Sequence, residues 1–443
     1  MDQSNNLPLK PNETLSSTTR VGHPKALPVL FLTEMWERFS YYGMRALLVL
    51  YAVKFLHFTD REAGQLYGAY TGLVYLTPIF GGWIADRYLG FRHSIIIGAI
   101  LMGIGHLLLA CDGLGFFFAG LSFLIIGNGF FKPNMSSLVG RLYEDRTNLK
   151  DSGYTIFYMG INLGGFFGPI LCGYLGEAIG WHYGFGAAGI GMGVGLLIFL
   201  LGQKLIPDSM GRRPLANNLF QTKIISNQLT QVEISRIKVI LVLTFFSIFF
   251  WSAFEQAGSS MNLFADRFVD RTVLNFTIPA SVFQSVNPVF ILLLAPLFAK
   301  LWTVLGKKSL EPDSAFKFSI GLFLLSFGFV CLVLGAREYN QYGIASLHWL
   351  ILAYLFNTLG ELCLSPVGLS MVSSMSPPRL GGLLMGMWFL SNAIAHYAGG
   401  VFSGIANEIG MDTFFGVFVV LAMIAGIILL VLRPKLSQWS EKS

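Results

Sequence analysis

The 443-residue sequence is 54% hydrophobic and only 12% charged, and it contains 40 phenylalanines and 50 glycines. A soluble fold could not bury this much apolar surface, so the composition excludes a soluble enzyme and predicts an all-α polytopic protein of the lipid bilayer. The formal net charge of +6 calls for no nucleic-acid partner, because the Lys and Arg residues concentrate in loops on one side of the predicted membrane region.

Twelve hydrophobic segments of spanning length follow one another along the chain. They predict an N-terminal six-helix bundle at 27–206 and a C-terminal six-helix bundle at 237–432. A polar linker at 207–236 joins the bundles, and tails at 1–26 and 433–443 flank them. The expected spans are 27–56, 63–86, 93–111, 115–140, 152–175, 183–206, 237–264, 275–303, 316–336, 345–375, 380–407 and 412–432.

The loop charges predict the orientation of the chain. If both termini are cytoplasmic, the cytoplasmic segments hold 22 Lys and Arg residues, the opposite side holds 5, and three lie inside spans. Cytoplasmic loops of membrane proteins carry such an excess of positive charge. We therefore expect a multi-pass protein of the inner (plasma) membrane with its two tails, and the linker, in the cytoplasm.

The first predicted span carries an unusual number of charged side chains. At about 100° per residue, six polar residues fall within an arc of roughly 140° and form one stripe along the helix. They are Glu34, Glu37, Arg38, Tyr41, Tyr42 and Arg45. A charge at bilayer depth is costly unless it faces water or a partner charge, so the stripe indicates a transport pathway.

The two halves of the chain show a faint internal repeat. The pattern Trp-x-x-Phe-x-x-x-Gly begins at Trp36 in the first span and again at Trp251 in the seventh. Gly127 in the fourth span and Gly360 in the tenth each precede a proline by six residues. Paired halves are typical of transporters that work by alternating access, with the substrate site between them near the middle of the membrane.

Buried polar residues also occur in later spans, at Lys132, Asn162, Glu255, Asn287 and Glu361. Inside the spans, three cations (Arg38, Arg45 and Lys132) therefore face four carboxylates (Glu34, Glu37, Glu255 and Glu361). The excess carboxylate leaves room for one proton. A zwitterionic substrate would add no net charge, and opposite charges could hold its amine and its carboxylate separately.

Each of these residues has a structural alternative. Lys132 is near enough to a cytoplasmic end to reach the interface, and Asn162 and Asn287 could bond neighbouring helices together. The aromatic residues near the stripe could simply pack in the core; they are Tyr41, Tyr42, Tyr75, Trp251 and Trp388. For Glu255 and Glu361, well inside their spans, a purely structural role is disfavoured.

Two levels of resemblance to known proteins follow from these motifs. The loop at residues 82–92 resembles the loop signature of the major facilitator superfamily. Three stretches resemble the first, fifth and tenth helix signatures of the proton-dependent oligopeptide transporter (POT) family, which belongs to that superfamily; they are Glu34-x-x-Glu37-Arg38-Phe-x-Tyr41-Tyr42-Gly, residues 157–164 and residues 360–368. Segments around Lys132 and Glu255 extend the resemblance over nearly the whole membrane region.

The resemblance implies a major facilitator fold of twelve transmembrane helices in two six-helix halves, and proton-coupled import of di- and tripeptides. It implies that Arg45 and Lys132 hold the peptide carboxylate and that Asn162, Asn287 and Glu361 hold its amino terminus. It implies proton coupling by Glu34, Glu37, Arg38 and Glu255, and side-chain pockets lined by Tyr41, Tyr42, Tyr75, Trp251 and Trp388.

One departure from the family and two alternative functions remain. Bacterial members usually insert two further helices between the halves, but residues 207–236 contain no run long enough to span a membrane. The first alternative is a proton-coupled carrier or antiporter of another zwitterionic or anionic metabolite or drug. The second is a membrane sensor that binds peptide without moving it. The sequence shows no metal-ligand cluster, phosphate loop or nucleophile motif, so we expect no enzyme activity, no metal and no cofactor other than the proton. We expect the monomer to be functional.

Overall fold

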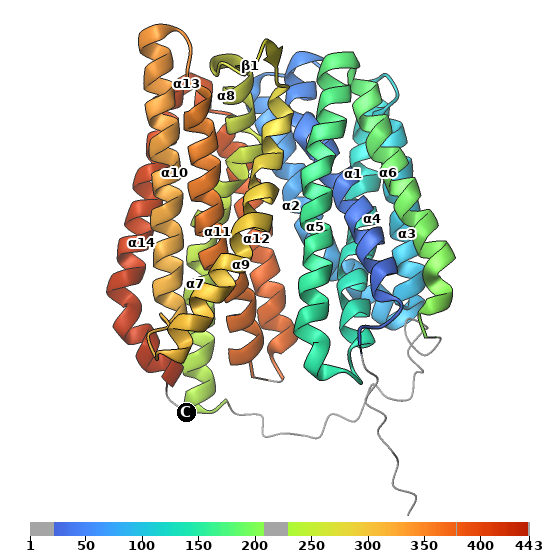
Figure 1. The fold of residues 1–443 in the computed structure, drawn as a ribbon, viewed down its shortest axis with the longest axis vertical. Coiled ribbons are helices and arrows are strands. Elements are labelled where there is room, and N and C mark those ends of the chain that lie inside the picture. The colour runs from blue at the N-terminus through green and yellow to red at the C-terminus, as the bar shows by residue number, and fades with distance from the viewer. Residues whose placement is uncertain (1–21, 208–228, 378, 442–443) are drawn as a thin grey trace, which may run out of the picture.

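The computed structural model describes residues 22–207, 229–377 and 379–441. Within these residues the chain forms twelve helices of 19 to 31 residues that run alongside one another (Figure 1). In the described part of the chain, nine helical segments are long and apolar enough to cross a membrane. The remaining three long helices, α1, α2 and α12, are less apolar, and they stand among the other nine in the bundle. The fold is thus the predicted all-α polytopic one.

The first six long helices come before the linker. They are α1 (Leu27–Lys54), α2 (Asp60–Ile84), α3 (Phe91–Leu109), α4 (Leu114–Leu142), α5 (Lys150–Tyr174) and α6 (Trp181–Gly202). Short turns extend or precede them: η1 (Ala85–Leu89), η2 (Thr147–Leu149), η3 (Leu175–Ile179) and η4 (Gln203–Leu205).

The second group follows the linker and is less regular. Its helices are α7 (Gln231–Phe254), α8 (Ser260–Phe268), α9 (Val286–Lys307), α10 (Ser314–Tyr342), α11 (Leu347–Met375), α12 (Gly381–Ser403), α13 (Ala406–Ile409) and α14 (Met411–Glu441). The 3-10 turns η6 (Glu255–Gly258) and η7 (Ala280–Ser285) and the antiparallel strands β1 (Thr272–Val273) and β2 (Phe276–Thr277) complete it.

The two groups lie side by side. In Figure 1 the blue-to-green helices α1 to α6 occupy the right of the view, and the helices α7 to α14 occupy the left. Within the first group α1 packs on α5 and α6, and within the second α10 packs on α11 and α14. The groups meet mainly where α2 packs on α12 and where α5 packs on η7 and α9.

The two ends of the bundle differ in what they carry. The linker side is the end where α6 ends, α7 begins and α14 ends, at the bottom of Figure 1. The hairpin side is the opposite end, which carries β1 and β2. Leu274 and Asn275 connect these strands with φ values of 49° and 65°, the left-handed conformation that a two-residue hairpin turn requires.

Local sequence signals account for several helix starts. Thr59 begins α2, and Thr230 begins α7, each in a capping box with the glutamate three residues later. In this arrangement the Thr side chain and the Glu side chain each bond a backbone N–H that the helix leaves unpaired. Asp313 caps α10 in the simpler way, by accepting a hydrogen bond from the backbone N–H of Phe316.

The helices differ from the expected segments in three places. The seventh span is broken at η6, so α7 and α8 replace one continuous helix at 237–264. The eighth span, expected from 275, has its α-helix only from Val286, because strand β2 and turn η7 come first. Helix α14 continues to Glu441, so most of the expected tail at 433–443 is helical. Of the linker, 208–228 lies outside the described residues, as do 1–21 and 442–443; the predicted domain limits stay predictions.

The contact between α2 and α12 depends on glycine. A Cβ atom on Gly68 or on Gly400 would overlap the backbone of the opposite helix, and one on Gly64 would meet the carbonyl oxygen of Gly400. Glycine at these positions therefore lets the two backbones approach much more closely than helices separated by side chains.

The first prediction tests this contact. Gly400→Ala should lower the thermal stability of the purified protein, because overpacking a tight contact costs about 1–3 kcal/mol. Gly416→Ala in α14 is the control, since no atom lies within 4 Å of an added Cβ there. The measurement is the melting temperature in detergent; equal melting temperatures for the two variants would contradict the close contact.

Candidate functional site

A cavity of about 180 Å³ lies between the two groups of helices, and we call it the central cavity. Both groups contribute to its wall, the first through α1, α2 and α5 and the second through α7, η6, η7, α9, α11 and α12. Eight of the fourteen predicted site residues line it; they are Tyr42, Arg45, Tyr75, Asn162, Trp251, Glu255, Asn287 and Glu361. The sequence patterns therefore converge on one space although they are far apart in the chain.

A larger cavity of about 730 Å³ continues from the central cavity toward the linker side. The two cavities share five wall residues, among them Asn162, Glu361 and Ser365. The walls of the larger cavity extend to Asp313, before α10, and to Met375, at the end of α11. The central cavity is thus approached from the linker side.

The hairpin side is closed by contacts between the two groups of helices. Three ion pairs join them: Arg267 with Asp60 at 2.7 Å, Lys54 with Asp266 at 2.6 Å, and Arg61 with Glu408 at 3.0 Å. The first is bidentate, since both terminal nitrogens of the guanidinium donate to the carboxylate. Exposed pairs contribute little each, but a bidentate Arg–carboxylate pair also fixes geometry.

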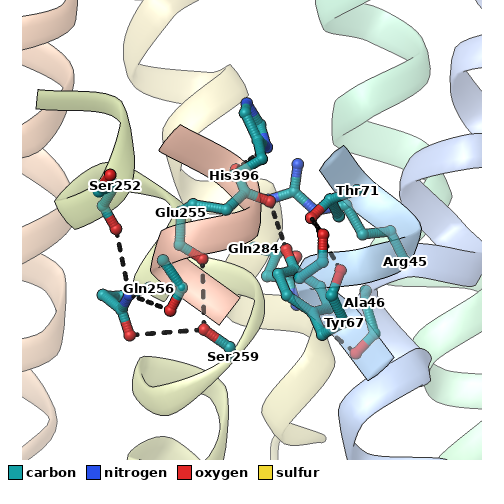
Figure 2. Close-up of polar contacts among 12 residues, drawn as sticks. Arg45, Ala46, Tyr67, Thr71, Ser252, Glu255, Gln256, Ser259, Gln284 and His396 are labelled. Atoms are coloured by element: carbon teal, nitrogen blue, oxygen red, sulfur yellow. Dashed lines mark hydrogen bonds and ion pairs between the residues drawn. The ribbon is translucent and has the colours of Figure 1, made fainter. Parts of the chain in front are cut away.

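Deeper in the bundle, four side chains from three helices and one turn form a buried group that we call the gate cluster (Figure 2). Its centre is Glu255 in η6, which is 1% exposed. Nη2 of Arg45 in α1 lies 3.4 Å from its Oε1, and Tyr67 in α2 donates a hydrogen bond to the same oxygen at 2.5 Å. Nδ1 of His396 in α12 lies 3.1 Å from the other oxygen, Oε2.

The break in the seventh span positions this cluster. Beyond Phe254 the backbone turns through η6, and the side chains of Glu255 and Gln256 leave in different directions (Figure 2). Gln256 donates to the carbonyl oxygens of Ser252 at 3.1 Å and Gly399 at 2.8 Å, which ties the turn to α12. Burying this amide without partners would be costly, so its bonds help to define the turn.

A second charged group, the stripe cluster, lies within α1 and comprises Glu34, Glu37 and Arg38. Nε of Arg38 is 3.2 Å from Glu34 and 2.5 Å from Glu37, and all three residues are at most 4% exposed. The cluster does not line the central cavity or its linker-side extension. Two carboxylates thus share one guanidinium in a buried place.

At the α11 wall of the central cavity, a carboxylate is held by an amide. Nδ2 of Asn287 in α9 donates to Oε2 of Glu361 at 2.9 Å and to Oγ1 of Thr358 at 2.9 Å. Asn162 in α5 lines the same cavity. The cavity therefore contains a cation from the first group of helices, Arg45, and a carboxylate from the second, Glu361.

Six predicted residues lie outside the central cavity. Besides the stripe cluster, Tyr41 packs beside the Arg38 guanidinium, whose Cζ is 5.2 Å from its ring centroid. Trp388 is 2% exposed and packs on Gly368 and Phe318, so in this conformation it does not line the central cavity, and its assignment to a side-chain pocket stays a prediction. Lys132 does not line the cavity either, because its Nζ sits 4.0 Å from the ring centroid of Tyr75.

The sequence reasoning missed two members of the gate cluster. His396 lies within the predicted eleventh span, and a titratable side chain inside an apolar span is itself a signal of a functional site. Tyr67 had no comparable signal, because tyrosines are common in membrane helices and only the fold brings this hydroxyl to Glu255.

Comparison with known proteins places these features in a family context. A sequence model described as the POT family matches residues 92–221 and 212–418. The peptide transporter YePEPT of Yersinia enterocolitica is 35% identical over 495 aligned residues, which cover 95% of this chain and 96% of the relative. The dipeptide and tripeptide permease A of Proteus mirabilis is 30% identical, with 97% and 98% of the two chains covered.

Solved structures agree with the sequence relatives. A peptide transporter POT in complex with sulfate matches with a TM-score of 0.87 at 33% identity, covering 95% of this chain and 96% of that one. A POT family transporter in complex with 5-aminolevulinic acid matches with a TM-score of 0.87 at 32% identity, covering 94% and 98%. The alignment with YePEPT is longer than this 443-residue chain, so that relative has segments without a counterpart here.

The second prediction concerns access to the cavity. The cysteine introduced by Ser365→Cys, at a position that lines both cavities, should react quickly with a membrane-impermeant thiol reagent added on the linker side. Reaction should be slow from the hairpin side, where the three ion pairs close the bundle. The exposed Cys111 is first replaced by serine, and labelling is measured in vesicles of known orientation.

Asp60→Asn in the same background supplies the comparison, because it removes the charge that pairs with Arg267. It should raise the labelling rate from the hairpin side only. Equal labelling of Ser365→Cys from both sides, without Asp60→Asn, would show that the hairpin side is not closed.

Proposed function

This chain belongs to the POT family of membrane transporters, and on that premise we propose that it imports di- and tripeptides together with protons by alternating access. It is a transporter and not an enzyme. In the proposed orientation the linker side faces the cytoplasm, both termini are cytoplasmic and the protein resides in the inner membrane. The structure then corresponds to an inward-open state, since the cavity is approached from the linker side.

The observation that carries the peptide proposal is the pair of opposite charges in one cavity. Arg45 and Glu361 both line the central cavity, and they come from opposite groups of helices. A short peptide at neutral pH is a zwitterion with a charge at each end, so Arg45 can pair with its carboxylate and Glu361, held by Asn287, with its amino terminus. Tyr42, Tyr75 and Trp251 supply apolar wall for side chains.

The assignment of Lys132 to the peptide carboxylate stays a prediction. In this conformation Tyr75 separates it from the central cavity, so Lys132 can reach a substrate only after that ring moves. Arg45 therefore supplies the carboxylate contact in the state described here.

The gate cluster supports a physical route to proton coupling. The Arg45–Glu255 pair joins the first group of helices to the second on the same side of the cavity as the three exposed ion pairs. A proton on Glu255 removes one charge of this pair, and a peptide carboxylate competes for the other. Either event weakens the closure of the hairpin side, so proton and peptide favour the same rearrangement.

The stripe cluster supports a second proton site. When Glu34 and Glu37 are both ionised, the Arg38 charge balances only one of them, and an unbalanced buried charge is costly. Binding one proton neutralises the cluster. We therefore propose that these three residues, with Glu255, carry the proton coupling.

The alternative substrate is another zwitterionic metabolite. It is favoured by the similarity to a transporter in complex with 5-aminolevulinic acid, whose amine and carboxylate are also separated by a short chain. The proposed working unit is the monomer, because a single chain supplies the whole cavity wall that the described residues form. The only coupling ion or cofactor in this proposal is the proton.

The third prediction tests the function directly. Liposomes containing the purified protein should accumulate labelled dialanine when the outside is more acidic than the inside. A gradient of one pH unit allows about tenfold accumulation for one proton per peptide, since each 1.4 kcal/mol is about a factor of ten. Glu255→Gln should still exchange labelled for unlabelled dialanine but should lose accumulation. A wild-type protein that moves no dialanine would refute peptide transport.

The fourth prediction tests ligand polarity. Glu361→Gln should weaken binding of free dialanine by about tenfold to a hundredfold, because a hydrogen bond to a charged group contributes about 1.5–3 kcal/mol. Binding of N-acetyl-dialanine, which has no charged amine, should hardly change relative to the wild type. Glu144→Gln at an exposed loop position is the control, and calorimetric titration in detergent gives both affinities. Equal losses for the two ligands would assign Glu361 a structural role.

A further inference from the structure

His396 occupies a place that the mechanism above does not use. It lies in α12, is 3% exposed, and has Nδ1 at 3.1 Å from Glu255 Oε2 (Figure 2). The ring of Tyr75 stacks on its ring, with a centroid distance of 4.2 Å and an interplanar angle of 27°. His396 also lines the central cavity together with Glu255 and Arg45.

Although Glu255 lines the central cavity, the contacts of its carboxylate limit how a proton can leave it. Glu255 is 1% exposed, and its oxygens contact three side chains: Arg45, Tyr67 and His396. The Arg45 guanidinium already carries its protons and cannot accept another. Tyr67 is fully buried and does not line the central cavity, and a phenol is a poor proton acceptor near neutral pH. An imidazole accepts and releases protons in this range.

We propose that His396 is the relay through which the proton bound at Glu255 passes into the central cavity when the carrier faces inward. This inference rests on the proton-coupled transport proposed above and identifies its exit step. His396 is thus assigned a direct role in moving the coupling ion, separate from any part in holding the peptide.

The transfer balances without any other reactant. The proton on Oε2 of Glu255 moves to the lone pair of Nδ1, leaving a carboxylate and an imidazolium. Nε2 then releases its proton to water in the cavity, and the neutral ring now carries its hydrogen on Nδ1. The ring resets when it turns about the Cβ–Cγ bond, Nδ1 releases its proton to cavity water and Nε2 takes one up, which moves no net charge. One proton has then left Glu255, which is a carboxylate, and His396 is neutral as before.

The surrounding charges give the step a direction. The groups that face His396 are Glu255 from η6, Tyr75 and Tyr67 from α2, and, through these, Arg45 from α1 and Lys132 from α4. While a peptide carboxylate holds Arg45, no cation balances Glu255, and the carboxyl keeps its proton. When the peptide leaves, Arg45 returns to Glu255 and favours the charged form of this carboxylate, so the carboxyl gives up its proton. Peptide release and proton release are therefore linked.

The fifth prediction tests the relay with His396→Gln. Glutamine is similar in size and retains an N–H donor for Glu255, but it cannot take up a proton. In liposomes this variant should exchange dialanine within about twofold of the wild-type rate, while accumulation under a pH gradient should fall from about tenfold to none. His182→Gln is the control, because His182 pairs with Asp112 at 2.9 Å at the surface, away from both cavities.

The possible outcomes distinguish a proton relay from other roles of His396. Normal accumulation by His396→Gln would overturn the relay and leave His396 a hydrogen-bond donor that holds Glu255. Loss of both exchange and accumulation in a variant that still binds dialanine would also overturn it, because exchange needs no net proton movement. Should His396→Gln fail to fold, as judged by its melting temperature, the same measurements on His396→Asn decide. The wild type separates the two proposals: if it does not accumulate dialanine, the proposed function itself fails.

Discussion

The buried ion pair between Arg45 and Glu255 is the interaction on which the central arrangement depends. One partner belongs to the first group of helices and the other to the second, and both are almost completely removed from water. Removing one partner of such a pair leaves an uncompensated buried charge. This destabilises a protein far more than replacing the whole pair with well-packed apolar residues does. The 3-10 turn η6 accompanies this pair. The α-helix of the seventh span ends before Glu255, and the turn places the Glu255 side chain against Arg45, Tyr67 and His396.

Much of the fold could be predicted from the sequence, because helix boundaries in membranes follow the length of apolar segments. The predicted first and tenth spans, 27–56 and 345–375, lie within two residues of α1 and α11. The polar stripe was also recognisable, because a charged side chain such as Glu37 is costly in an apolar membrane helix and therefore indicates a functional site. The same rule singled out Asn162, Glu255 and Glu361, and the fold brings all three to the central cavity.

The rest could not be predicted, because it depends on which helices become neighbours. Hydropathy does not reveal that η6 interrupts the seventh span. The residues around Gly258 are largely polar, but polarity alone does not distinguish a break in a helix from a polar stretch within one. Trp388 looked like a cavity residue, yet the small Gly368 on α11 offers it a place in the core. Lys132 stops at the ring of Tyr75, and a cation resting on an aromatic face is satisfied without reaching the substrate.

The glycine contact between α2 and α12 has a mechanical consequence. Side chains that interlock between two packed helices favour particular crossing angles. Where Gly64 and Gly68 meet Gly400, the backbones pack directly on each other. No interlocking side chains therefore oppose a change in the crossing angle between the two helices. This contact is a close approach between the two groups of helices. If the two groups rock against each other as proposed above, this contact can change its crossing angle without separating interlocked side chains.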